Sequence, residues 1–355
     1  MVREEAMMSV VYSLGCLTVL ALLTCSSAHM PAIPKSEKLS SRHEQRERET
    51  SHLNQLNTSA LNAALAFEPY RDLATKSTAM PGVQQQRPNN ILFSPLGLVS
   101  ALALLCRVSG SESRSQALEA LGMAANSTQE SVEATISTLT DLQHSLTLQE
   151  GGGGGLQPFE RRHTGLRSFK LNATTSVETA MMYRDDSSEV MMLYDTNCSA
   201  TVVRMAFSER LASLLLLPKG ELQPLEDCLS DSRMSFWVSN LKPGRAEIRF
   251  PKFQLRKSYS LESLLRNAGV SSIFSQRTNF AGIAKKKMLE LIKAPHEVML
   301  EVGESKLEDR GRPDIQLDFS VPQRITFDRP FMLIVYDDLT GIVLLIGRIT
   351  DPTDA

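Results

Sequence analysis

The sequence has 355 residues, 42% of them apolar, and a formal net charge of −2 at neutral pH. This length and apolar content are sufficient for one large domain, or two small ones, with a sizeable core. The small net charge argues against a general polyanion such as nucleic acid, and against a membrane surface, as the partner.

Residues 1–28 have the pattern of a secretory signal peptide. Arg3 lies in the n-region, residues 10–23 form an apolar run of h-region length, and residues 26–28 supply small side chains for cleavage. A transmembrane anchor is the alternative, but the run is shorter than the ~20 apolar residues that a span needs. The sequence therefore predicts a secreted, extracellular chain.

Secretion makes two kinds of covalent modification relevant. Asn-Xaa-Ser/Thr triplets are N-glycosylation acceptors where they are exposed, and this chain has them at Asn57, Asn126, Asn172 and Asn197. Without the leader the cysteines are Cys106, Cys198 and Cys228, an odd number that does not make a disulfide framework. A Cys198–Cys228 disulfide can form, whereas Cys106 lies in an apolar run and is expected to be a small buried thiol.

The first part of the mature chain is predicted to be a mobile arm followed by helices. Residues 29–50 are polar and charged, which predicts a mobile N-terminal arm. Residues 51–73 carry apolar side chains at helical spacing, which predicts an amphipathic helix. A short strand and a second helix follow from residue 89, with Ser94 as the predicted N-cap and Pro95 as the first helical residue.

The middle of the chain combines a glycine run with predicted strands. The glycines at residues 151–155 form a hinge, a flexible splice between segments, or an error in the gene model. Apolar runs at residues 202–205 and 214–218 are typical of buried strands. Residues 246–255 alternate, which predicts a strand with one solvent-facing side, and residues 258–265 predict the start of a helix.

The most specific pattern lies near the end of the chain. Residues 325–338 and 342–352 are apolar strands joined by an acidic, glycine-containing turn, which predicts a buried hairpin. This hairpin resembles the C-terminal signature of the serpins. The Asn-apolar-Ser-Pro segment at residues 89–95 also resembles that family, which places a similar segment at the start of a buried helix. The resemblance covers roughly residues 51–150 and 156–352.

The resemblance implies an α+β, serpin-like fold with helices packed on three β-sheets, as a single domain over residues 51–355. It extends to the secreted group that contains antitrypsin, angiotensinogen and the hormone-binding globulins. That family would place two further helices and several strands of its main sheet where this chain has about a dozen residues. We therefore expect an internal deletion near residues 147–158 that removes those two helices and part of the main sheet, including a central strand.

The resemblance also implies an exposed loop that acts as protease bait and, in inhibitory members, inserts into the main sheet after cleavage. Residues 295–304 resemble the strand that enters this loop. Insertion requires small side chains, but the hinge consists of Ser305, Lys306, Leu307, Glu308, Asp309, Arg310, Gly311 and Arg312. Charges fall on both alternating faces, and a buried charge without a partner costs several kcal/mol. These residues predict a degenerate hinge.

No catalytic or metal site is predicted. The six histidines are scattered, and the chain has no Ser/His/Asp motif, phosphate-binding loop or HExxH helix. We therefore expect no enzymatic activity and no cofactor. Arg310, Arg312 and Arg324 are candidate cleavage sites for a trypsin-like protease.

Together these patterns predict a secreted serpin-family glycoprotein that is non-inhibitory and acts as an extracellular carrier or binding protein. Its expected partner is a small hydrophobic ligand or a serine protease, and it is expected to be a monomer. Nucleic acid and membranes are not expected partners. The alternative function is inhibition of a serine-type endopeptidase through the loop at residues 305–324.

Overall fold

The computed structural model describes residues 9–12, 61–78, 89–124, 127–130, 132–134, 137, 163–185, 189–206, 210–274, 295–303 and 321–354. Its helices are η1 (Ala63–Phe67), α4 (Glu68–Thr78), α5 (Pro95–Val108), α6 (Ser111–Ala120), α8 (Gln223–Cys228), α9 (Asp231–Asn240), α10 (Leu261–Asn267) and η3 (Ser272–Phe274). Its strands are β1 (Ser9–Tyr12), β2 (Ile91–Phe93), β3 (Gly165–Lys170), β4 (Ser176–Arg184), β5 (Glu189–Asp195), β6 (Ala200–Ala206), β7 (Leu211–Pro218), β8 (Lys242–Pro251), β9 (Phe253–Ser260), β10 (Pro295–Val302), β11 (Gln323–Thr326), β12 (Phe331–Asp337) and β13 (Val343–Ile349).

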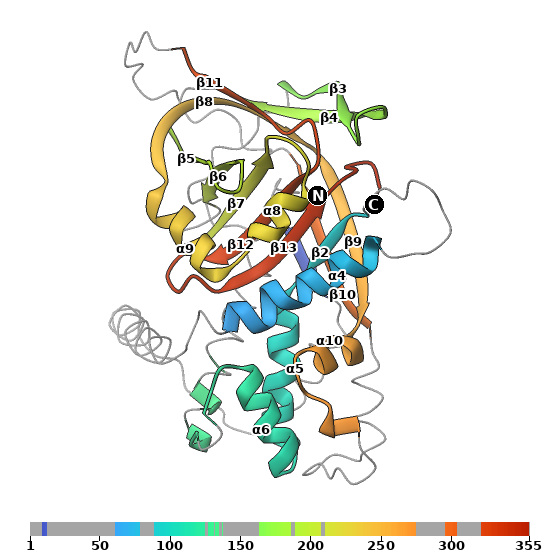
Figure 1. Ribbon diagram of the computed structural model, residues 1–355, viewed down its shortest axis with the longest axis vertical. Helices are drawn as coiled ribbons and strands as arrows, with labels where there is room; N and C mark the ends of the chain where they lie inside the picture. Colours follow the sequence, from blue (N-terminus) through green and yellow to red (C-terminus); the bar gives the residue numbers. More distant parts are fainter. Residues whose placement is uncertain are drawn as a thin grey trace, which may run out of the picture.

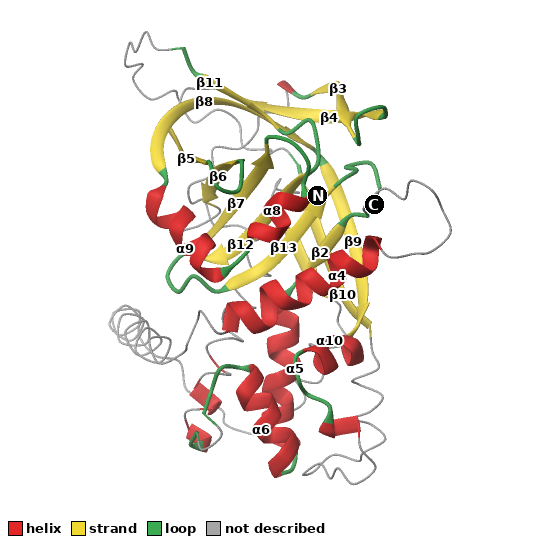
Figure 2. Cartoon of the chain, viewed as in Figure 1, coloured by secondary structure: helices red, strands yellow, loops and turns green. Residues whose placement is uncertain are grey.

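The described strands form two sheets. The smaller sheet has the order β1-β10-β9, and the larger has the order β2-β13-β12-β7-β6-β5-β8-β4-β3 with β11 paired to β8. Figure 1 shows α5, α6 and α10 at one end of the long axis, and β3, β4, β8 and β11 near the other. The same view coloured by secondary structure shows a helical end and a strand-rich end (Figure 2).

Strand β8 connects two halves of the larger sheet. Its first residues pair antiparallel with β5, and its last residues pair antiparallel with β4. Strand β11 runs parallel to β8 on its other edge. The three sheets of the predicted α+β fold are therefore present as the small sheet and two larger ones that β8 joins.

The core lies on the strands with continuous apolar sequence. Every residue of β7, β12 and β13 is buried. The predicted C-terminal hairpin is confirmed, because β12 and β13 pair antiparallel. Its turn places Gly341 at a φ of 75°, a left-handed conformation that glycine adopts without steric cost.

One predicted strand is two strands in the structure. Strand β8 ends at Pro251 and β9 begins at Phe253, so the segment predicted as one strand over residues 246–255 belongs to both sheets. The chain changes sheet at Lys252, whose backbone N–H donates to the Ala180 oxygen at 2.8 Å. The prediction was wrong here because alternation of apolar and polar residues is the same on either side of the change.

The start of α5 differs from the prediction in one contact. Pro95 is the first helical residue, as predicted, but the Ser94 side chain makes no capping hydrogen bond. Its hydroxyl instead donates to the backbone oxygen of Leu344 on β13, at 3.1 Å. The buried hydroxyl therefore ties the helix to the hairpin rather than closing the first helical turn.

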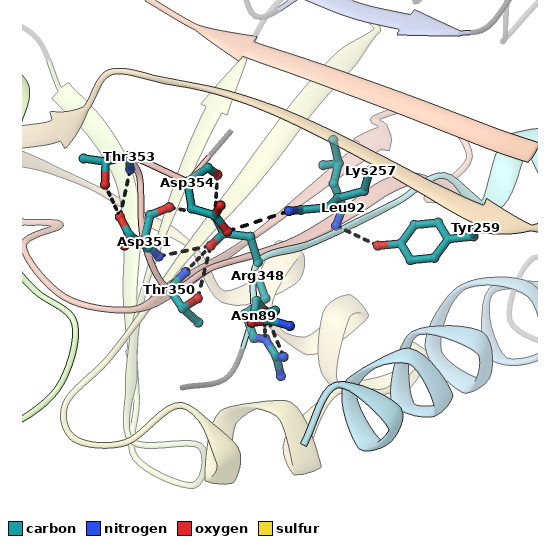
Figure 3. Close-up of polar contacts among 10 residues, drawn as sticks. Asn89, Leu92, Lys257, Tyr259, Arg348, Thr350, Asp351, Thr353 and Asp354 are labelled. Atoms are coloured by element: carbon teal, nitrogen blue, oxygen red, sulfur yellow. Dashed lines mark hydrogen bonds and ion pairs between the residues drawn. The ribbon is translucent and has the colours of Figure 1, made fainter. Parts of the chain in front are cut away.

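Polar contacts join β2 to the last described residues of the chain (Figure 3). The Asn90 amide donates to the backbone oxygens of Asp351 and Asp354, at 2.6 and 2.9 Å, and its oxygen accepts from the Thr350 backbone N–H at 2.7 Å. In the same region, the Leu92 backbone N–H donates to the Tyr259 hydroxyl at 3.3 Å. These bonds fix β2, and with it the entry to α5, against both sheets.

Candidate functional site

The loop predicted to act as protease bait follows a strand of one sheet and precedes a strand of the other. Strand β10 of the small sheet ends at Val302, and β11 of the large sheet begins at Gln323. The hinge residues 305–312, with the candidate cleavage sites Arg310 and Arg312, lie outside the described residues. Val321, just before β11, is 93% exposed.

The third candidate cleavage site, Arg324, lies within β11 rather than in a loop. Its side chain is 82% exposed, and its Nε donates to Glu247 Oε2 on β8 at 3.1 Å. An exposed ion pair of this kind contributes little to stability. The backbone of Arg324 is nonetheless part of the parallel β11–β8 ladder, which makes it less accessible than a loop residue to a protease cleft.

Strand β10 presents one buried face beside the candidate loop. Val298, Leu300 and Val302 are buried, and Met299 and Glu301, which alternate with them, are less so. Strand β10 pairs antiparallel with β9 on one edge and, at residues 298–301, with β1 on the other. Any strand that took the place of β1 would therefore send alternate side chains to this buried face.

His296, at the start of β10, packs tightly against α5. A Cβ added at Gly97 would lie 2.0 Å from His296 Cε1, so only glycine fits at that position of the helix. The imidazole also packs edge-on against Phe93, with ring centroids 6.2 Å apart. Burial lowers the pKa of His296 to about 4, although a hydrogen bond with the Ser94 backbone acts in the opposite direction.

A second group of polar contacts surrounds Asp195, at the end of β5. Trp237 Nε1, from α9, donates to one carboxylate oxygen at 2.6 Å. Arg233, also from α9, and the Asn197 backbone N–H donate to the other. We call Asp195, Asn197, Cys198, Arg233 and Trp237 the Asp195 cluster.

The electrostatics of the Asp195 cluster favour an ionised carboxylate. Burial alone would raise the pKa of Asp195, but hydrogen bonds from Trp237, the Cys198 and Asn197 backbone N–H groups and Arg233 outweigh it and lower the pKa. Trp237 is fully buried. The cluster therefore holds α9 and the turn after β5 in one fixed arrangement.

Helix α9 also contacts the first described helix and the C-terminal hairpin, in a group that we call the α9 corner. The Asn62 amide donates to Asp231 Oδ1 and to the Gly341 oxygen, both at 2.9 Å. The Asn62 oxygen accepts from the Val343 backbone N–H at 2.9 Å. A buried amide thus joins three elements.

Of the remaining predicted site residues, the structure brings together the two cysteines of the predicted disulfide. Cys198 and Cys228 form a disulfide with a Cα–Cα distance of 5.8 Å, and Cys106 is a buried free thiol. The acceptors Asn172 and Asn197 are both exposed, on the β3–β4 turn and the β5–β6 turn. Asn57 and Asn126 lie outside the described residues.

Comparison with known proteins places this arrangement in a family. A family model described as serpin (serine protease inhibitor) matches residues 154–352, more than half of the chain. The chain belongs to the serpin family. Because that family is one of protease inhibitors, this serpin is not an enzyme.

The relatives include both inhibitors and a carrier. The chain is 30% identical over 199 residues to the alpha-1-antiproteinase of Callosciurus caniceps, which is 56% of this chain and 48% of the relative. It is 29% identical over 195 residues to the thyroxine-binding globulin of Homo sapiens, which is 53% of this chain and 46% of the relative. The matches therefore span about half the length of these relatives.

A solved structure supports the fold over a longer part of the chain. The human thyroxine-binding globulin complexed with thyroxine superposes with a TM-score of 0.66 at 20% identity, covering 85% of this chain and 100% of that one. The predicted serpin-like fold is confirmed, and the described helices are fewer than those of a full serpin. Across the described ranges, no helix has the length and apolar character to cross a membrane. No group of His, Cys, Asp or Glu suited to hold a metal ion occurs among the same residues.

Sequence reasoning missed the residues that organise these sites. Asp195 precedes a glycosylation triplet but gives no local sign of its partners on α9, which lie 38 and 42 residues further along the chain. The close approach of Gly97 to His296 is likewise invisible in the sequence, because the two residues lie on different elements.

Proposed function

We propose that this serpin is secreted and glycosylated, does not inhibit proteases by loop insertion, and acts as an extracellular carrier or binding protein. The charged side chains of the hinge are the main support for the proposal that the loop does not insert. Lys306, Glu308, Arg310 and Arg312 share one alternating face, and Asp309 lies on the other. Either face of an inserted strand would therefore bring charge into the sheet.

The geometry of β10 explains why that charge matters. A strand inserted beside β10 would place alternate side chains on the same face as Val298, Leu300 and Val302, which are buried. A buried charge without a partner costs several kcal/mol, and one face of the hinge carries four of them, so the cost exceeds the about 1 kcal/mol that each backbone hydrogen bond of the strand returns. The small sheet is a second obstacle if the predicted deletion removes a central strand, because without the predicted leader, which contains β1, its described strands are β10 and β9.

We expect the melting temperature of the secreted protein to stay unchanged after one trypsin cut at Arg310 or Arg312. The cut loop cannot insert, so no new strand is added to stabilise the sheet. Thermal unfolding followed by circular dichroism, before and after the cut, measures this directly. A large rise in melting temperature after the cut would contradict the proposal and favour protease inhibition by loop insertion.

A matched variant separates the two obstacles to insertion. Alanine at Lys306, Glu308, Arg310 and Arg312 removes the charges from one face but leaves the sheet as it is, with cleavage then made at an engineered site near residue 312. A rise in melting temperature after cleavage of this variant alone would assign the effect to the hinge charges. If neither protein shows a rise in melting temperature after cleavage, the sheet rather than the hinge charge prevents insertion.

The carrier role is supported by the likeness to thyroxine-binding globulin, whose name states its ligand. We expect thyroxine to quench the fluorescence of Trp237, the one tryptophan of the chain, with a saturable dependence on concentration. Asn62→Ala should raise the apparent Kd if the ligand binds near Trp237, because it removes bonds that hold α9, the helix that carries Trp237. Arg324→Ala, exposed on β11, is the control that should not. Quenching that rises linearly, after correction for absorbance, would argue against this ligand.

Inhibition of a serine-type endopeptidase is the second candidate, because relatives are named antiproteinases. It predicts a covalent complex with a trypsin-like protease that survives a denaturing gel. If only cleaved chain appears when the protein is mixed with trypsin, the non-inhibitory proposal stands.

A further inference from the structure

One of the predicted glycosylation triplets contains half of a disulfide. The triplet Asn197-Cys198-Ser199 lies in the turn between β5 and β6, and Cys198 is bonded to Cys228 at the end of α8. Asn197 is exposed, whereas Cys198 is only 2% exposed. The acceptor side chain is accessible to solvent, but its backbone belongs to a cross-linked turn.

Hydrogen bonds close this turn from several sides. The carboxylate of Asp195 accepts the backbone N–H groups of Asn197 and Cys198, at 3.0 and 3.4 Å. Arg233 Nε donates to Cys198 Sγ at 3.1 Å. Ser199 has a φ of 47°, and its hydroxyl donates to the Thr196 oxygen at 3.5 Å rather than to the acceptor amide. The folded turn therefore holds the triplet in a conformation that an enzyme could change only by opening it.

The triplet at Asn172 provides a contrast within the same chain. It lies on the turn between β3 and β4, is exposed, and contains no cysteine. There Asn172 Oδ1 accepts from the Thr174 hydroxyl at 3.1 Å and from the Thr174 and Thr175 backbone N–H groups at 2.9 and 2.8 Å, so hydrogen bonds close this turn without a covalent cross-link. Folding of this hairpin places no cross-link across the acceptor.

N-glycosylation and disulfide formation, two reactions of the secretory pathway, thus act on neighbouring residues of one turn. In N-glycosylation the Asn197 amide nitrogen bonds to the anomeric carbon of a lipid pyrophosphate-linked oligosaccharide, the carbon–oxygen bond to pyrophosphate breaks, and the amide loses a proton to an enzyme base. In disulfide closure the thiols of Cys198 and Cys228 lose two protons and two electrons, which reduce a disulfide of an oxidoreductase. Once the disulfide is closed, the backbone of the triplet can no longer extend into an enzyme.

We propose that closure of the Cys198–Cys228 disulfide ends the period in which Asn197 can be glycosylated. Glycan occupancy at Asn197 is therefore set by the rate of disulfide closure, whereas occupancy at Asn172 is not. Because Asn197 is exposed in the folded chain, a glycan added first still permits the disulfide to close. The proposal rests on the secreted, glycosylated character proposed above.

Glycopeptide mass spectrometry of the full chain, expressed in secretory eukaryotic cells, tests the proposal. Both cell-associated and secreted protein are digested, so variants that are retained in the cell are still measured. In the unaltered chain we expect lower occupancy at Asn197 than at Asn172. In Cys228→Ser, occupancy at Asn197 should rise to that of Asn172, which should itself stay constant. Cys198→Ser keeps the acceptor triplet and should give the same rise.

A variant that destabilises the fold but keeps both thiols is the matched control. Gly97→Ala introduces a Cβ 2.0 Å from His296 Cε1, on α5 rather than on α8 or the turn, and should leave the ratio of the two occupancies as in the unaltered chain. A rise at Asn197 in this variant would overturn the proposal, because slow folding rather than the open disulfide would be responsible.

Two further results would overturn the proposal in distinguishable ways. If Asn172 is glycosylated and Asn197 does not respond to Cys228→Ser, or is as fully occupied as Asn172 in the unaltered chain, the inference fails alone. If neither asparagine is glycosylated and no chain reaches the medium, the proposed secretion fails, and the inference fails with it.

Discussion

Replacing Arg348 with methionine should lower the free energy of unfolding by about 3 to 5 kcal/mol, because it leaves a buried carboxylate without its cation. Arg348 on β13 and Glu226 on α8 are 1% and 4% exposed, and Arg348 Nη1 lies 2.9 Å from Glu226 Oε1. The same guanidinium donates to the Asn89 oxygen at 3.1 and 3.0 Å, as Figure 3 shows. Urea unfolding of both proteins at pH 7 measures the difference.

A second replacement distinguishes the ion pair from packing. Tyr70 donates its hydroxyl to Glu226, and burial, followed by the charge of Glu226, raises the pKa of Tyr70 well above its ordinary value. Glu226→Gln combined with Arg348→Met removes both charges but keeps a group that can accept from Tyr70. The double variant should be more stable than Arg348→Met alone. If the single and double variants lose the same stability, the loss comes from side-chain volume rather than from the unpaired charge.

Acid should destabilise this serpin through His296. The imidazole has a pKa of about 4 in the folded chain and an ordinary value of 6.5 when unfolded, so the unfolded state binds more protons between these pH values. The stability that neutral His296 provides is therefore complete above pH 6.5 and is lost as the pH falls toward 4. The loss amounts to about 3 kcal/mol, the free energy of a shift of this size.

Comparison with His296→Gln isolates this contribution. Among the residues that the structure describes, His296 contacts Phe93, Gly97 and the Ser94 backbone, and its partner across the ladder is Tyr259, whose pKa burial raises to about 12. None of these titrates between pH 4 and 6.5. Asp195, with its lowered pKa, loses its contribution only at lower pH. Urea unfolding at pH 7 and pH 4.5 should show a smaller decrease for His296→Gln; an equal decrease would exclude His296 as the cause.

The sequence predicted those parts of the fold that depend on local pattern. The buried hairpin β12–β13 was predictable because its strands are continuously apolar and its turn contains Gly341. The helix that begins at Pro95 was predictable from proline at the first helical position. The change of sheet at Lys252 was not, because it depends on which distant strand each half meets.

The contacts that organise the candidate sites depend on long-range pairing. Glu226 and Arg348 are 122 residues apart, and Ser94 bonds to an oxygen 250 residues away. No local spacing identifies such partners, since burial of each charge is known only once the elements have packed. The disulfide between Cys198 and Cys228 was easier to anticipate, because the predicted loss of the leader would leave few cysteines from which to choose.

The pairing of β1 with β10 connects a processing event to the architecture of a sheet. Strand β1 lies at Ser9–Tyr12, inside the predicted leader, and it covers one edge of β10 at residues 298–301. Cleavage of that leader would shorten the chain and also leave β9 as the one described strand that pairs with β10. An uncovered strand edge is a template for pairing with another chain. If the predicted leader is removed, the β10 edge would therefore be open to a strand of another chain in the processed protein and covered in the precursor.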